Sequence, residues 1–129
     1  MATRRLCALL VVMVVVCGVT TAASATPIVV NGRLAVLGDS IATGVASSNP
    51  LITYTPFPTL LQASAPDGVL NFGANGETCG DMLARWPSVE AAGPDLVLIE
   101  CGTNDIVRGV TPGIFVDNLV ALIVAARRA

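Results

Sequence analysis

The chain has 129 residues, enough for one small domain and too few for a multidomain enzyme. Seven arginines face nine Asp and Glu residues, and the sequence contains no lysine and no histidine. With no basic stripe, the chain lacks the electrostatic footprint of nucleic-acid binding, and we expect no nucleic-acid partner.

The first 25 residues predict a secretory signal peptide. Arg4 and Arg5 form a basic start, residues 6–16 are an unbroken apolar run, and residues 23–25 read Ala-Ser-Ala, an A-x-A cleavage pattern. We therefore expect export to the periplasm or the medium, with cleavage after Ala25.

An uncleaved membrane anchor and a lipoprotein are the alternatives. A spanning helix needs about 20 apolar residues, and this run ends earlier, at the threonines. Attachment through Cys17 is disfavoured because bulky Val16 precedes it. Residues 26–129 keep five arginines against nine carboxylates, a net charge of about −4, and we expect them to form one domain without membrane contact.

Three short runs of branched apolar residues predict buried strands: Leu34–Leu37, Val69–Phe72 and Leu96–Ile99. Each run is bounded by Gly, Pro, Asp or Asn, and the intervening segments are long enough for helices. This alternation predicts an α/β domain with a parallel sheet covered on both faces.

The segments between the strands predict two short helices. Residues 57–64 place Phe57, Leu60 and Leu61 on one face, and residues 78–86 begin at Thr78 and stop before Pro87.

The last helix has the clearest signals. Thr111 is a suitable N-cap, and Pro112 suits the first helical position. Its apolar face is formed by Phe115, Leu119, Leu122 and Ile123.

Short polar loops follow each predicted strand: residues 38–40 (Gly-Asp-Ser), 73–76 (Gly-Ala-Asn-Gly) and 102–105 (Gly-Thr-Asn-Asp). Ligands of open parallel sheets bind at the carboxyl ends of the strands. We therefore expect the three loops to converge on one small site.

These loops contain what acyl transfer requires. Ser40 supplies a hydroxyl nucleophile, while the Gly76 backbone N–H and the Asn104 side-chain amide can donate to an oxyanion. The backbone N–H of Ser40 is a third donor. Singly, each residue is more typical of a turn or loop, and it is their coincidence at successive strand ends that favours a site. Phosphate binding is disfavoured because neither G-K-[ST] nor G-x-G-x-x-G is present.

GDS after the first strand, NFGANGET after the second and GTND after the third resemble, in order and spacing, the first three sequence blocks of the SGNH/GDSL hydrolases. The resemblance covers about residues 33–125. It implies a three-layer α/β/α flavodoxin-like fold, here C-terminally incomplete with about three strands. It also implies ester hydrolysis of a small acyl or acetyl ester, thioester or lysophospholipid, with no cofactor and no metal.

The resemblance makes Ser40 the nucleophile, and Gly76 and Asn104 the oxyanion donors beside the Ser40 N–H. Gly76 is preferred to Gly73 because it precedes Glu77-Thr78, as in the family pattern. The IVRGVTP stretch that follows GTND is most similar to the bacterial arylesterase, acyl thioesterase and lysophospholipase branch.

The family's fourth block, D-x-x-H, has no counterpart in this sequence, so neither the catalytic histidine nor its aspartate is present. Without a base, a serine hydroxyl is a poor nucleophile. The other aspartates examined as bases, Asp39, Asp81, Asp105 and Asp117, are all weak candidates.

Two interpretations remain open. The chain is the N-terminal portion of a longer or frameshifted hydrolase, or it is an inactive remnant that binds an acyl group weakly. A sheet ending at the third strand would leave that strand's outer edge unpaired and predict poor solubility, which argues against a working remnant. We favour the incomplete hydrolase, and coding DNA beyond Ala129 containing a D-x-x-H would support it.

Cys79 and Cys101 follow the predicted signal, so they would reach an oxidising compartment. They can pair or remain two small buried thiols, and zinc is disfavoured because neither C-x-x-C nor histidine accompanies them. We expect free, buried thiols rather than a disulfide.

Overall fold

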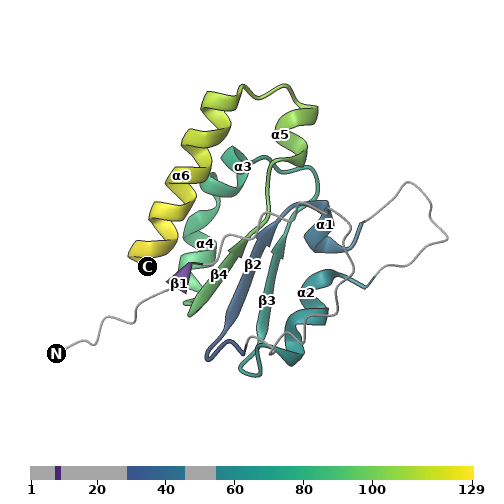
Figure 1. Ribbon diagram of the computed structural model, residues 1–129, viewed down its shortest axis with the longest axis vertical. Coiled ribbons are helices and arrows are strands. Elements are labelled where there is room, and N and C mark those ends of the chain that lie inside the picture. Colours follow the sequence, from purple (N-terminus) through teal and green to yellow (C-terminus); the bar gives the residue numbers. More distant parts are fainter. Residues whose placement is uncertain (1–7, 10–28, 46–54) are drawn as a thin grey trace, which may run out of the picture.

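The computed structural model describes residues 8–9, 29–45 and 55–129, and its main feature is a parallel sheet (Figure 1). The central strand β2 (Leu34–Gly38) pairs on one side with β3 (Val69–Gly73) and on the other with β4 (Leu96–Ile99). All three predicted strands and the parallel α/β class are confirmed.

Side chains of β2 alternate between two cores, one on each face of the sheet. Ala35 and Leu37 enter the larger cluster, while Leu34 and Val36 enter the smaller one. All five residues of β2 are buried, as expected for a strand covered on both faces.

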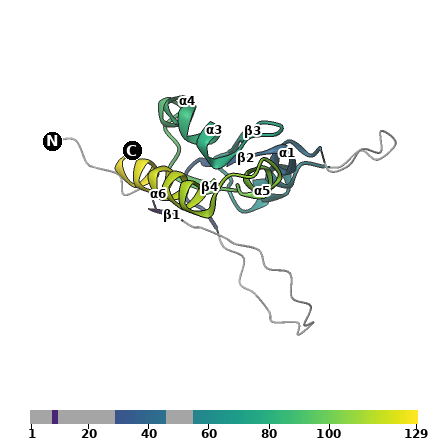
Figure 2. The ribbon, with the colours of Figure 1, turned by 90° about the horizontal axis from the view of Figure 1, so that it is seen from above.

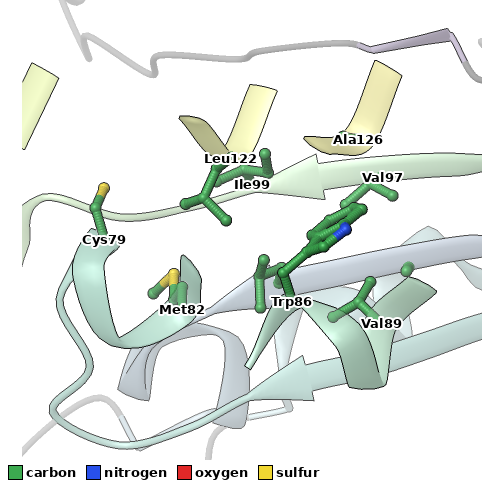
Figure 3. Packing of buried hydrophobic residues seen from close by; sticks show 10 residues of the cluster. Cys79, Met82, Trp86, Val89, Val97, Ile99, Leu122 and Ala126 are labelled. Atoms are coloured by element: carbon green, nitrogen blue, oxygen red, sulfur yellow. The ribbon is translucent and has the colours of Figure 1, made fainter. Parts of the chain in front are cut away.

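The larger core lies under α3 (Cys79–Ala84), α4 (Trp86–Ala91) and α6 (Pro112–Arg128). Figure 3 shows side chains of α3 and α4 facing side chains of α6 and β4 in this core. The smaller core is covered by α1 (Ser40–Thr43), α2 (Phe57–Leu60) and the 3-10 helix η1 (Leu61–Ala63). The result is the three-layer arrangement implied by the resemblance.

The helix expected to stop before Pro87 is instead two helices. Thr78 caps α3 as predicted, and a capping box links it to Asp81. The chain breaks at Arg85, and Pro87 then occupies the first turn of α4. Proline is compatible with that position because first-turn amides have no intrahelical acceptor, so the expectation that Pro87 simply ends a helix is wrong.

The predicted helix over residues 57–64 is divided between α2 and η1. Phe57 and Leu61 pack against the smaller core, but Leu60 is 69% exposed. Its placement on the apolar face is therefore wrong.

The predicted last helix is confirmed as α6, with Thr111 as its N-cap and Pro112 as its first residue. Leu122 and Ala126 are buried on its inner face. The opposite side exposes large apolar residues, namely Ile114, Val116, Val120 and Val124. No helix in the described part of the chain is long and apolar enough to cross a membrane.

A short helix, α5 (Thr103–Val107), replaces the loop expected after β4. Gly102 precedes it with φ +122°, a conformation that other residues rarely adopt. Ile106 and Val107 of α5 are exposed.

The outer edge of β4 carries a two-residue strand, β1 (Ala8–Leu9), which pairs in parallel with Leu96 and Val97. The expectation of a wholly unpaired outer edge is therefore wrong. Figure 2 shows α6 lying beside β1 at this side of the sheet, and the two elements are in contact. The rest of the predicted signal peptide, including its cleavage site, lies outside the described residues.

Candidate functional site

The three loops do converge at the carboxyl end of the sheet, where α1, α3 and α5 begin (Figure 1). A single side chain joins them. Asn104 Nδ2 donates to Asp39 Oδ2 at 2.9 Å and to the Glu77 carbonyl oxygen at 2.9 Å. The loop after β4 is thus bonded to both the loop after β2 and the loop after β3.

Ser40 is the first residue of α1 and directly follows a buried aspartate. Asp39 caps this helix, its Oδ1 accepting the Ile41 N–H at 2.8 Å. First-turn amides of a helix have no intrahelical acceptor. Among the described residues the Ser40 N–H has no partner, so it stays available to a ligand beside the Ser40 hydroxyl.

Gly76 has φ +77°, which places its peptide in the left-handed region that favours glycine. Its N–H has no acceptor within the described part of the chain, whereas its carbonyl oxygen accepts from Arg108 Nη2 at 2.6 Å. Gly73 has a different constraint, because a Cβ there would lie 2.8 Å from the Thr43 backbone nitrogen. Gly73 therefore serves the packing of α1 on β3, and Gly76 presents a free donor.

Asn104 has a less open geometry than the sequence suggested. Both hydrogens of its amide are already donated, one to Asp39 and one to Glu77. Asn104 can contribute to an oxyanion only by sharing or redirecting one of them. In this arrangement its evident task is to hold the loops together.

The other aspartates considered as bases either accept hydrogen bonds within the fold or are exposed. The Thr78 backbone N–H and then its hydroxyl lower the pKa of Asp81, and Arg108 adds to this effect. Asp105 is buried and accepts the Cys79 N–H at 3.0 Å, although its Oδ1 has no partner among the described residues. Asp117 is exposed on α6.

Glu100 belongs to the site, although the sequence analysis did not identify it. Its Oε2 accepts the Asp39 N–H at 3.2 Å, directly behind the Ser40 turn. Burial raises the pKa of the Glu100 carboxyl, and the nearby Asp39 carboxylate raises it further, partly opposed by the hydrogen bond from the Asp39 N–H. The signal in the sequence is a glutamate directly after an apolar strand.

Cys79 and Cys101 form a disulfide, so the expectation of free thiols is wrong. Their Cα atoms are 5.5 Å apart, within the range that a disulfide spans. The sequence could not show this proximity, because it arises only when the start of α3 packs beside the end of β4. The bridge lies three residues after Gly76 and three residues before Asn104, and so links the two candidate oxyanion loops covalently.

Comparison with known proteins gives a consistent picture. Residues 36–129 match the GDSL-like Lipase/Acylhydrolase family. The chain is 38% identical over 93 residues to an arylesterase of Vibrio mimicus, covering 70% of this chain and 46% of that protein. It is 36% identical over 100 residues to esterase TesA of Pseudomonas aeruginosa, covering 73% and 48% of the two chains.

Among solved structures, an acetyl xylan esterase variant from Geobacillus stearothermophilus superimposes with a TM-score of 0.62 at 28% identity. The match covers 80% of this chain and 58% of that one. The chain therefore spans about half the length of the curated relatives it matches. The family match over residues 36–129 includes all three loops of the site.

Proposed function

Because the chain belongs to the GDSL-like lipase/acylhydrolase family, we propose that its serine loop takes part in the hydrolysis of small-molecule carboxylic esters. The observation that carries this proposal is the Asn104 amide, which bonds the Ser40 loop to the Gly76 loop. Three residues suited to acyl transfer thereby lie in one connected cluster.

In this proposal the Ser40 hydroxyl oxygen attacks the ester carbonyl carbon, and its proton passes to a base as the tetrahedral oxyanion forms. The Ser40 and Gly76 N–H groups stabilise that oxyanion, joined by a redirected Asn104 hydrogen. On collapse, the leaving oxygen takes the proton back from the base and departs as the alcohol, leaving an acyl-serine that water then hydrolyses. No cofactor is needed for these steps.

The described mechanism needs a general base to accept the Ser40 proton, and this chain does not supply one. The 129 residues contain no histidine, and the aspartates near Ser40 are engaged in caps or buried hydrogen bonds. Removing a triad member from a serine hydrolase lowers turnover by about 10⁴-fold or more. We therefore propose that the 129-residue chain is inactive alone and that the Asp and His must come from further sequence.

The relatives support a general class of substrate. The chain is similar in sequence to an arylesterase and to an esterase, and an acetyl xylan esterase superimposes on it, which supports short acyl esters as substrates. The same attack by a serine hydroxyl also hydrolyses thioesters and lysophospholipids, which are the alternative substrates.

Hydrolysis of p-nitrophenyl acetate and butyrate tests the proposal directly. We expect the chain to equal a Ser40→Ala control, and a clear Ser40-dependent burst would contradict the predicted inactivity. Fusing residues 26–129 to the C-terminal remainder of the Vibrio mimicus arylesterase should produce hydrolysis that Ser40→Ala abolishes. If the folded fusion shows no Ser40-dependent turnover, the chain is an inactive remnant.

We also propose that residues 1–25 direct export and are removed. The basic start, the apolar run and the A-x-A pattern support this, and the Cys79–Cys101 disulfide suits an oxidising compartment. Mass spectrometry of exported protein should find Thr26 at the N-terminus. Recovery of intact Met1 protein from the membrane fraction alone would contradict it.

A further inference from the structure

The geometry points to Arg85 as a positioning residue that holds the Ser40 turn and the Gly76 loop in one fixed arrangement. The inference rests on the proposed function, because it takes Ser40 as the nucleophile and Gly76 as an oxyanion donor. Arg85 is assigned no contact with substrate and acts through the backbone of the two loops.

Arg85 lies at the junction of α3 and α4, and its guanidinium reaches three separate segments. Nε contacts Glu77 Oε2 at 2.6 Å, in the loop that contains Gly76. Nη2 donates to the Phe72 carbonyl oxygen at 2.5 Å and to the Gly38 carbonyl oxygen at 3.4 Å. One side chain therefore connects the ends of β2 and β3 with the loop between β3 and α3.

Gly38 ends β2, two residues before Ser40, and its carbonyl oxygen also accepts the Ala74 N–H at 2.9 Å. Arg85 and Ala74 thus share one acceptor at the base of the nucleophile turn. Loss of the guanidinium would leave that carbonyl bonded to the Ala74 N–H alone and weaken the contact between the two loops.

Glu77 is held at two points. Arg85 binds its carboxylate, and Asn104 donates to its carbonyl oxygen. The two contacts therefore anchor the residue that directly follows Gly76 in the loop. Anchoring Glu77 limits movement of the loop that carries the Gly76 N–H, and oxyanion stabilisation requires donors that are held in place.

The chemistry favours arginine at this position. The side chains of Arg85 and Glu77 are only 25% and 18% exposed, so water screens their contact less than at the surface. A planar guanidinium can serve a carboxylate and two carbonyl oxygens from fixed directions, whereas a lysine ammonium is a single point charge on a flexible stem.

Other arginines provide a contrast within the chain. Arg108 donates to the Gly76 carbonyl oxygen at 2.6 Å and forms a half-exposed ion pair with Asp81, so it reaches the Gly76 loop and the start of α3. Arg85 differs because it also bonds the ends of β2 and β3. Arg33 donates through Nη2 to the Gly93 carbonyl oxygen at 2.9 Å, away from the site loops. Arg33→Met therefore removes one arginine-to-carbonyl bond elsewhere and is the matched control.

Hydrogen exchange measured by mass spectrometry on the full chain tests the inference without requiring turnover. In Arg85→Met we expect about tenfold faster exchange over residues 39–44 and 74–78, because charged hydrogen bonds to both loops are lost. The Ala74 amide is the most direct reporter. Arg33→Met should leave both segments unchanged.

Arg85→Lys is the conservative variant and guards against a failure of Arg85→Met to fold. It should retain protection near Glu77 and still lose it at Ala74, because lysine keeps the charge but not the fork. Unchanged exchange in both loops, or a uniform rise that includes β4 and α6, would overturn the inference. Absence of Ser40-dependent turnover in the fusion would instead overturn the proposed function and leave these exchange rates unaffected.

Discussion

The carboxyl end of the sheet and its outer side differ in their contacts. Polar groups at the carboxyl end are bonded to one another, whereas apolar groups on the outer side are exposed. At the carboxyl end, Asn104, Arg85, Arg108 and a disulfide connect loops that are distant in sequence. On the outer side, the described residues pair β4 with nothing beyond the two-residue β1, and α6 exposes valines and an isoleucine.

The difference shows that the three loops of the candidate site are joined by bonds among the described residues themselves. No other segment is needed to bring the loops of Ser40, Gly76 and Asn104 together. The outer side, by contrast, has the apolar character of a surface that packs against further protein, as exposed apolar patches commonly do. The following predictions test that contrast, from the largest expected effect to the smallest.

The two faces of α6 should respond very differently to truncation. Leu122 is fully buried and Val120 is 51% exposed. We expect Leu122→Ala to lower the free energy of unfolding by about 2–5 kcal/mol, and Val120→Ala to change it by about 0.5 kcal/mol or less. Urea unfolding measures both, and equal losses would show that the outer face is covered in solution.

Removing the disulfide should weaken the carboxyl end. The bridge spans 22 residues, and in the chain-entropy account a closed loop of that size contributes about 3 kcal/mol. The Cys79→Ala/Cys101→Ala pair should lose about that amount in urea unfolding. Wild-type protein unfolded with a reductant should show the same loss, and a double variant as stable as the oxidised chain would contradict the prediction.

Two threonine caps allow a smaller comparison. Thr78 belongs to a complete capping box at the start of α3, while Thr111 accepts the Ile114 N–H at a long 3.5 Å. Thr78→Ala should cost about 1 kcal/mol, and Thr111→Ala clearly less. Thermal unfolding of the two variants side by side measures the order, and the reverse order would contradict the contrast between the regions.

Glu100 should make stability depend on pH. Its pKa is raised in the folded chain, so its protonated form is favoured by folding. Its contribution is full below the ordinary glutamate pKa and is lost as pH rises through the raised value. From about pH 4.5 upward, wild type should therefore lose stability relative to Glu100→Gln.

Urea midpoints across the pH range measure this difference, with Glu90→Gln, on an exposed part of α4, as control. Parallel curves for wild type and Glu100→Gln would show that Glu100 is not coupled to folding.

The strands were predictable because each is a short apolar run ending in polar or turn residues, as at Leu34–Leu37. The cap of α6 was predictable for a similar reason, since Thr111-Pro112 is a local signal. Pro87 is ambiguous in the sequence because a proline can end one helix or begin another. Only the packing of Trp86 and Val89 in the core selects the second outcome.

The candidate site was predictable in its loops but not in its connections. Ser40, Gly76 and Asn104 each follow a strand, and parallel topology brings strand ends together. Three connections depend on distances between segments. They are the bonds from the Asn104 amide to Asp39 and Glu77, the bond between Glu100 and Asp39, and the Cys79–Cys101 bridge. No pattern within one segment contains that information.

The position of β1 has a consequence for timing. Ala8 and Leu9 lie within the segment proposed to be removed on export, so cleavage would also remove the strand beside β4. Before cleavage the chain covers part of its own sheet edge. After cleavage the peptide groups of Leu96 and Val97 that had paired with β1 would lose these hydrogen bonds. Another parallel strand could then pair with them.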